Sequence, residues 1–566
     1  MVGKYFLNKY IKKHTSLLIL GGISILILSL LLLPTPFLTR HIIDNVLPNK
    51  NLEKLIIFIS VVLIILLLQK ILGYFQNFLF YKINNKIIYD IKLDLLKKIN
   101  SISLKISKQF GTGYLISRIN SDTQRLRSLF ADTMIHIVKD VFTFIVGFCA
   151  IFYIHWKLAI VSVVLLPFFA VTTIYFSKKI RSISKIYFED DSQTVKQLDE
   201  TLSMIELIKQ YSRQKFNILR YISKANISYK SYVKLGKISF TNNLVIGLIG
   251  GLAPIIIIGY GGYEIINERL TIGSLIAFNS FVGYLFGPTN RLVNVNVQIQ
   301  QALVALNRIK ELFDMESEPI KEIENFSNIE NISFNNVNFN YEENEKLIDK
   351  LSFKIYKGEK VAIVGGSGNG KTTIFRLLTG LYDIDSGEIR INNRTASYPE
   401  IVFLRKKIAV VEQEPFMFDD TIYNNIALGK AGATKEEIYN VAENAYVNNF
   451  ADKMVDGLLT QVGIKGSNLS VGQKQRISIA RALLKSPDVL LMDEATSNID
   501  TISEKYIEKT ISAIGKDKIV IIVAHRLSTI RNCDKIFVLE NGTIKESGTH
   551  DELMCNESVY YQLNCA

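Results

Sequence analysis

A glycine-rich segment with one lysine and two threonines lies at Gly365–Thr373 and has the sequence GGSGNGKTT. The apolar run Lys360–Val364 precedes it, and the run Ile374–Thr379, which favours a helix, follows it. In the order strand, glycine loop and helix, backbone N–H groups can surround a polyphosphate, and the positive end of the helix dipole faces it. The segment therefore predicts a phosphate-binding loop.

The same loop carries side chains suited to ATP and Mg²⁺. Lys371 can reach the β- and γ-phosphates, and the Thr372 hydroxyl can bind Mg²⁺. The other loop residues that we expect at the nucleotide are Gly365, Gly366, Ser367, Gly368, Asn369, Gly370 and Thr373. The expected cofactors are therefore ATP and Mg²⁺.

Two carboxylates end a second apolar run, Val489–Glu494, with the sequence VLLMDE. Asp493 would hold Mg²⁺ through water, and Glu494 would polarise the water that attacks the γ-phosphate. A buried strand with an ordinary acidic end is the competing interpretation, and it would be preferred if this run stood alone.

Further candidate residues lie around these two motifs. In the segment LSVGQKQRISIARALL, Ser470 and Gly472 open a predicted helix, whose N-terminus is a second anion site. Gln413 follows a predicted strand in VVEQEP, and His525 follows another in IIVAHR. Tyr341 precedes the glycine loop.

The N-terminal half contains six uncharged apolar stretches. Hydrophobic residues make up 48% of the 566 residues and the mean hydropathy is +0.20, which is unusual for a soluble protein. A helix needs about 20 residues to cross the hydrocarbon of a bilayer, so each stretch is a candidate span. The stretches are Thr15–Thr39, Leu55–Gln69 with its continuation to Tyr81, Val141–Trp156, Leu158–Ser177, Ile238–Tyr263 and Leu270–Asn290.

Basic residues beside these stretches predict the orientation in the membrane. The formal net charge is +13, and Lys and Arg concentrate at the N-terminus and in two long polar stretches, residues 82–140 and 178–237. The positive-inside rule places these segments, and with them the C-terminal half, in the cytoplasm. Their helix-forming composition predicts helices that continue beyond the bilayer. No basic recognition motif indicates a nucleic-acid partner.

Changes in composition divide the chain into three predicted parts. Residues 1–313 form the membrane domain, residues 314–331 an acidic linker, and residues 332–566 the ATPase domain. The Gly287-Pro288 pair should loosen the sixth span. Asn279, Asn290 and Arg291 are candidates to line a cavity there. The four cysteines lack metal-ligand spacing and are predicted to be free thiols.

Together and in this order, the motifs resemble those of the ATP-binding cassette (ABC) transporters. The glycine loop is similar to Walker A, VLLMDE to Walker B, LSVGQ to the LSGGQ signature, Gln413 to the Gln-loop residue and His525 to the switch histidine. Six spans fused ahead of the ATPase resemble the exporter branch. The resemblance implies an all-α six-helix membrane domain with long cytosolic extensions, followed by an α/β P-loop ATPase domain with a helical subdomain. FGTGYLISRINSDT and ELIKQYSRQKF look like the family's two coupling segments.

The resemblance also implies roles for single residues. Tyr341 would stack on adenine, Gln413 would sense Mg²⁺ and the membrane domain, and His525 would contact the γ-phosphate. Family members sandwich two ATP molecules between facing cassettes, so the signature would complete the site of a partner subunit. The signature residues concerned are Ser470, Gly472 and Gln473. Val471 departs from the family pattern, which usually has a glycine there.

These features predict an ATP-driven exporter that works by alternating access in a bacterial cell membrane. The partner is a second half-transporter, and the intact motifs favour a homodimer over a heterodimer. Lipid, drug-like amphiphile and peptide all remain open as cargo. The alternative is an ATP-gated channel or regulatory membrane protein on the same scaffold, against which the presence of Glu494 and His525 argues.

Overall fold

The computed structural model describes residues 6–128, 134–321, 328–341, 347–495, 499–524, 526–556 and 558–565. The chain forms two compact units. The first comprises Met1–Asn100 and Gly111–Met315, and the second comprises Ser101–Phe110 and Glu316–Ala566. No feature of the sequence indicated that Ser101–Phe110 would belong to the second unit.

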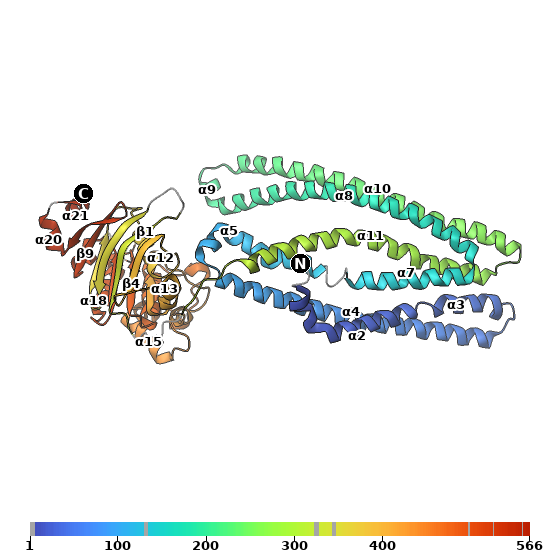
Figure 1. Cartoon of the computed structure of the whole chain (residues 1–566), viewed down its shortest axis with the longest axis horizontal. Helices are drawn as coiled ribbons and strands as arrows, with labels where there is room; N and C mark the ends of the chain where they lie inside the picture. The colour runs from blue at the N-terminus through green and yellow to red at the C-terminus, as the bar shows by residue number, and fades with distance from the viewer. Residues whose placement is uncertain are drawn as a thin grey trace. The chain divides into compact units, whose positions relative to one another are not determined.

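Long helices make up the first unit (Figure 1). They are α2 (Thr15–Leu30), α4 (Leu52–Ser101), α7 (Met134–Ile154), α8 (Trp156–Ser203), α10 (Gln214–Ile266) and α11 (Ile272–Asp314), with α3 (Pro34–His41), α5 (Leu104–Ser117), α6 (Thr123–Ser128) and α9 (Ile205–Gln210) as shorter helices. Helices α8 and α10 run side by side and are joined through α9 (Figure 1). At 1.5 Å per residue, the 50 residues of α4 extend about 75 Å, well beyond the hydrocarbon layer. The prediction of helices longer than the bilayer is confirmed.

Five helical segments of the described residues are long and apolar enough to cross a membrane. They are Asn8–Val46, Leu52–Ser101, Ile137–Ile154, Trp156–Ser203 and Gln214–Ile266. The sixth predicted span lies in α11, which is not among these five, because Asn279 and Gly287-Pro288 make it less apolar. Helix α11 continues through Pro288, so the proline does not end it.

The outer surface of α4 explains why this unit needs a lipid environment. The most apolar window of α4 contains no buried residue, and Leu63, Ile64 and Leu67 are exposed within the chain. An apolar helix surface of this length is stable in hydrocarbon and costly in water. The first unit is therefore suited to a bilayer.

The second unit contains two β-sheets. The four-stranded sheet has the order β2-β1-β4-β5, and the six-stranded sheet has the order β10-β9-β3-β8-β7-β6. The strands are β1 (Asn331–Phe339), β2 (Ile348–Tyr356), β3 (Lys360–Val364), β4 (Ser386–Ile391), β5 (Arg394–Thr395), β6 (Ile408–Val411), β7 (Val489–Asp493), β8 (Ile519–Val523), β9 (Lys535–Glu540) and β10 (Thr543–Gly548). Strands β6, β7, β8, β3 and β9 are parallel neighbours. The strands predicted at residues 360–364 and 489–494 are confirmed to within one residue.

Helices surround these sheets. They are α12 (Lys371–Leu378), α13 (Tyr398–Leu404), α14 (Ile422–Ala427), α15 (Lys435–Asn444), α16 (Asn448–Ala451), α17 (Val471–Leu484), α18 (Thr501–Ala513), α19 (Leu527–Arg531), α20 (His550–Cys555) and α21 (Val559–Cys565). Strands β7 and β8 are buried along their whole length, as expected for parallel strands covered on both faces. The sheet therefore places the carboxyl ends of β3, β6 and β7 at the same edge, with β8 between β3 and β7.

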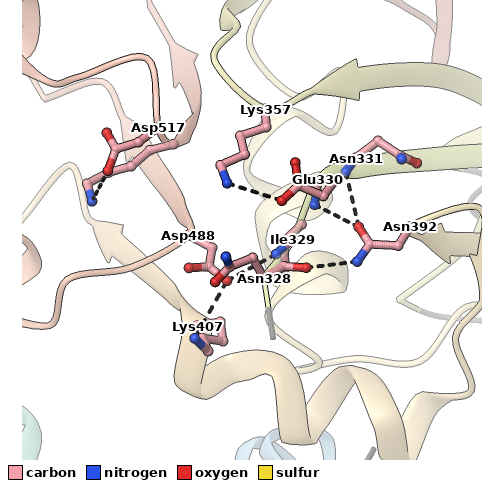
Figure 2. Close-up of polar contacts among 10 residues, drawn as sticks. Asn328, Ile329, Glu330, Asn331, Lys357, Asn392, Lys407, Asp488 and Asp517 are labelled. Carbon is pink, nitrogen blue, oxygen red and sulfur yellow. Dashed lines mark hydrogen bonds and ion pairs between the residues drawn. The ribbon is translucent and has the colours of Figure 1, made fainter. Parts of the chain in front are cut away.

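A group of hydrogen bonds fixes the chain just before β1, the first strand of the second unit (Figure 2). The side-chain oxygen of Asn392 accepts hydrogen bonds from the N–H groups of Glu330, at 2.7 Å, and Asn331, at 3.2 Å. The N–H of Ile329 donates to the Asp488 carboxylate at 3.1 Å. These bonds satisfy backbone groups just before β1 and fix where that strand begins.

Candidate nucleotide site

The glycine loop turns sharply from β3 into α12. Gly370 is the N-cap residue of α12 and has φ 93°, in the left-handed region that L-residues disfavour. A Cβ at Gly370 would lie 2.7 Å from Cδ1 of Ile348. Both the backbone and the packing therefore require glycine at the point where the helix begins. Ser367, Gly368 and Thr372 remain exposed on the outer side of the loop.

Lys371 folds back on the loop that carries it. The side chain is buried, and Nζ donates to the carbonyl oxygens of Gly365 and Gly366 at 2.8 and 2.9 Å. Burial lowers the pKa of Lys371, and the charges of Glu494 and Asp493 oppose that shift. A polyphosphate in the loop would supply the negative charge that this buried ammonium lacks.

Asp493 ends β7 beside the glycine loop. Its carboxylate is buried and hydrogen-bonds the Thr372 side chain. Burial raises the pKa of Asp493, while Thr372 and Lys371 lower it. A hydroxyl and a carboxylate in contact are hard oxygen donors of the kind that Mg²⁺ prefers. Among the described residues no group of three His, Cys, Asp or Glu side chains that could hold a metal ion is present.

Glu494 meets Gln413 at the neighbouring strand end. Nε2 of Gln413 donates to Oε2 of Glu494 at 2.8 Å. Glu494 has φ 45°, and its N–H donates to the carbonyl of Val523 at 2.9 Å. This left-handed backbone turns Glu494 away from the line of β7 at the carboxyl edge of the sheet, where ligands of open parallel sheets bind.

Tyr341 lies beside the start of α12. Its hydroxyl is 3.1 Å from Oγ1 of Thr373 and accepts a hydrogen bond of 2.8 Å from Nη1 of Arg376. The ring packs edge-on against Phe339 and Tyr382. The structure thus brings Tyr341 to the same loop as Lys371.

The signature residues form a separate group. Oγ of Ser470 accepts from the Gln473 N–H at 3.3 Å, and Oε1 of Gln473 accepts from the Ser470 N–H at 2.9 Å, which makes a capping box for α17. A Cβ on Gly472 would lie 2.5 Å from Oγ of Ser503, so close packing on α18 requires this glycine. Ser470 and Val471 are exposed.

The glycine-loop residues and the signature residues differ in whether they line the cavity beside Asp493. A cavity of about 620 Å³ is lined by Thr372, Gln413 and Asp493 together with three basic residues. Within the described residues none of the three signature residues lines it. Val471 lines a second cavity of about 420 Å³, which Gln413 also lines. His525 lies outside the described residues, so its contact with the γ-phosphate stays a prediction.

The basic side chains of the first cavity were not identified from the sequence. They are Arg376, Arg405 and Lys485. Arg376 lies four residues after Thr372 on α12, and this helical spacing is the one signal that could have indicated it. Arg405 and Lys485 come from distant segments and carry no such signal.

The candidate cavity residues of the membrane unit have a different outcome. Arg291 forms a bidentate ion pair with the buried Asp140, with Nη2 to Oδ1 at 2.6 Å and Nε to Oδ2 at 2.8 Å. Asn279 is half-buried, and the side chain of Asn290 lies outside the described residues. Asp140 therefore neutralises the one charge that was predicted to face a cavity.

Comparison with known proteins identifies the family. Residues 18–289 match the family described as "ABC transporter transmembrane region", and residues 348–497 match the family described as "ABC transporter". The chain is 32% identical to the "Putative multidrug export ATP-binding/permease protein YgaD" of Bacillus subtilis, over 94% of this chain and 93% of that protein. It is 33% identical to an "ATP-dependent lipid A-core flippase" of Desulfotalea psychrophila, over 93% and 92%.

A solved structure agrees with these relatives. The structure of a bacterial Atm1-family ABC exporter with ATP bound superposes with a TM-score of 0.82 at 26% identity, over 99% of this chain and 98% of that chain. The chain belongs to the ABC transporters. It is an ATP-driven exporter of the half-transporter type, a bacterial membrane protein that binds ATP, couples its hydrolysis to transport, and dimerises.

Proposed function

We propose that this chain forms a homodimer in the bacterial cell membrane and moves an amphiphilic cargo out of the cytoplasm by alternating access. The observation that carries the homodimer is the division of the candidate nucleotide residues into two groups. Lys371, Asp493 and Glu494 lie together at the carboxyl edge of the parallel sheet, whereas Ser470, Gly472 and Gln473 lie at the start of α17, and none of these three lines the cavity beside Asp493. One chain thus supplies two halves of a site, and a second identical chain can complete both.

In this proposal each group has a defined task. The glycine loop and Lys371 hold the phosphates, Tyr341 stacks on adenine, and Mg²⁺ is held by Thr372, Asp493 and Gln413. Glu494 polarises the attacking water, and His525 contacts the γ-phosphate. The partner subunit contributes its signature to the same ATP through three residues. They are Ser470, Gly472 and Gln473.

The proposed cycle depends on a difference in affinity. ATP shifts the pair of cassettes toward contact only if it binds the closed pair more tightly than the open one. The long helices α4, α8, α10 and α11 then carry the change to the membrane region, and hydrolysis resets it. This arrangement places the second unit and the N-terminus in the cytoplasm, where ATP is, in agreement with the basic flanks of the spans.

The nature of the relatives supports an amphiphilic cargo. Their names refer to multidrug export and to lipid A-core flipping, and both cargo classes combine apolar and polar parts. The Asp140–Arg291 pair gives the membrane unit a polar feature without net charge. A screen of ATPase stimulation by lipids, dyes and peptides in nanodiscs would identify the class. Lack of stimulation by all three, with ion current across a bilayer, would favour the channel alternative.

The test of the nucleotide site is Glu494→Gln in the purified dimer. We expect ATP and Mg²⁺ to bind while hydrolysis falls by at least about 100-fold, because a positioned general base typically contributes 10²–10⁴. The exposed Glu436→Gln, in α15, is the matched control and should hydrolyse ATP like the parent. Parent-like hydrolysis by Glu494→Gln would show that another group activates the water.

A further inference from the structure

The chain segments that follow α4 and α11 are hydrogen-bonded to each other inside the second unit. Ser101 is the last residue of α4, and Ser317 follows α11 by three residues. Ile102 forms a β-bridge with Ser317, and the N–H of Glu318 donates to the carbonyl of Ser101 at 2.7 Å. The hydroxyl oxygens of Ser101 and Ser317 lie 3.0 Å apart. The ends of α4 and α11 therefore enter the second unit as one joint.

A bidentate ion pair connects this joint to the rest of the second unit. Nη1 and Nη2 of Arg405 donate to the two carboxylate oxygens of Glu318 at 3.0 and 3.2 Å. The same guanidinium donates to the carbonyls of Thr379 and Gly380 at 2.7 and 2.8 Å. These carbonyls are at the C-terminal end of α12, where an arginine also suits the helix dipole. One side chain thus joins the linker to the helix that begins at Lys371.

The turn that carries Arg405 is itself held from several sides. It is the single 3₁₀ turn η6 (Arg405–Lys407). Nζ of Lys485, at the end of α17, donates to the carbonyls of Arg405 and Ile408 at 2.9 and 2.6 Å. Lys407 pairs with Asp488 at 3.8 Å, and Asp488 accepts from the Ile329 N–H (Figure 2). The turn is therefore attached to α17 and to both described ends of the linker.

We propose that Glu318 and Arg405 are positioning residues that couple the joint of α4 and α11 to the nucleotide site through α12. Helix α12 has eight residues, with Lys371 at its first position and Thr379 at its C-cap. A displacement of its C-terminal end is passed to Lys371 because so short a helix moves as a rigid body. The pair is bidentate and partly buried, so it holds direction as well as distance. This inference rests on the proposed function.

The test measures motion and ATP binding separately. The samples are homodimers in nanodiscs in a Glu494→Gln background, with the four native cysteines replaced. A nitroxide is attached through Glu268→Cys, in the exposed turn between α10 and α11. Pulsed electron resonance then reports the distance between the two labels with and without ATP and Mg²⁺. We expect Glu318→Ala to reduce the ATP-induced change in the populations by about fivefold or more, with ATP affinity within about twofold of the parent.

Two variants serve as comparisons. Glu316→Ala changes an exposed carboxylate two residues earlier in the linker and should behave as the parent. Glu318→Gln keeps the shape and one hydrogen bond and should give an intermediate response. A full response in Glu318→Ala would overturn the inference, and so would an equal loss of ATP affinity, which would mean that the pair only supports the cassette. A parent that shows no ATP-driven change would instead contradict the proposed function.

A cross-link tests whether the joint stays closed during the cycle. In Ser101→Cys/Ser317→Cys with the native cysteines replaced and Glu494 intact, oxidation links the two chain segments. We expect ATP turnover within about twofold of the reduced form, because a joint that acts as a unit has no need to open. Inhibition that is reversed by reductant would show that the segments must separate and would overturn the proposal.

Discussion

Two buried charges of opposite sign lie within the candidate nucleotide site. Burial lowers the pKa of Lys371 and raises that of Asp493. For both side chains, removal from water makes the charged form less stable. For Asp493, the raised pKa makes its stabilising contribution complete below the ordinary carboxyl pKa of about 3.9 and removes it as the pH rises through the raised value. In its ionised form the Asp493 carboxylate therefore destabilises the fold until a cation joins it.

This argument predicts the behaviour of Asp493→Asn. Without nucleotide at pH 7.5, the variant should unfold at a higher temperature than the parent, because the buried charge is removed while Thr372 can still donate a hydrogen bond. Each kcal/mol relieved raises the melting temperature by about 2–4 °C for a domain of this size. The further rise on adding ATP with Mg²⁺ should be lost. The measurement is calorimetry with and without the ligands.

The pH dependence gives the control for this prediction. The difference in melting temperature between Asp493→Asn and the parent should shrink as the pH is lowered toward the ordinary carboxyl pKa of about 3.9, because the raised pKa keeps the parent carboxyl mainly protonated there. A variant that is less stable than the parent at pH 7.5 would mean that the charge of Asp493 is already compensated without Mg²⁺.

For single residues, the sequence predicts which side chains belong to the nucleotide site but not the hydrogen bonds that they form in the structure. Lys371, Asp493 and Glu494 follow from motifs in which the chemistry demands those side chains. The bonds from Lys371 to its own loop and from Gln413 to Glu494 could not be foreseen, because they depend on how three strand ends meet. The same holds for Arg405, whose partner Glu318 comes from a distant linker.

Among the elements, α17 shows how a functional motif is also a structural one. Ser470 and Gln473 cap its N-terminus in both directions. Ser470→Ala should cost about 1 kcal/mol, the usual price of losing such a cap, and speed hydrogen exchange in the first turn about fivefold. Ser470→Thr keeps the hydroxyl and should restore protection. Exchange measured by mass spectrometry would decide, and unchanged exchange in Ser470→Ala would mean that packing on α18 alone fixes the turn.

The elements were predictable in proportion to their local signals. Strands β3 and β7 coincide with apolar runs bounded by glycine or charge. Helix α11 continues through Pro288 and packs against α7, α3 and α8, while the loosening that Gly287-Pro288 predicts stays a prediction. The association of Ser101–Phe110 with the second unit has no local signal, because it arises from a pairing with residues far along the chain.

For the whole molecule, the separation of the two residue groups leads to a prediction about mixed dimers. Lys371→Ala removes the phosphate-binding side of a chain's site, and Ser470→Arg blocks the signature side. Either variant alone should form an inactive homodimer. A dimer with one copy of each should regain activity, because one composite site then combines an intact loop from one chain with an intact signature from the other. Two identical chains related by a twofold axis make this exchange possible.

The matched control sets the size of the effect. A dimer of Lys371→Ala with the parent chain also has one composite site that is complete, so its turnover should equal that of the Lys371→Ala and Ser470→Arg dimer. Co-expression with two affinity tags and sequential purification isolates each mixed dimer for ATPase measurement. If each chain instead held a whole site, the parent-containing dimer would keep about half of the activity while the doubly variant dimer would have none, since independent sites contribute additively. Equal turnover in both dimers requires that ATP be hydrolysed between the chains, where the loop residues of one copy and the signature residues of the other bind the same ATP.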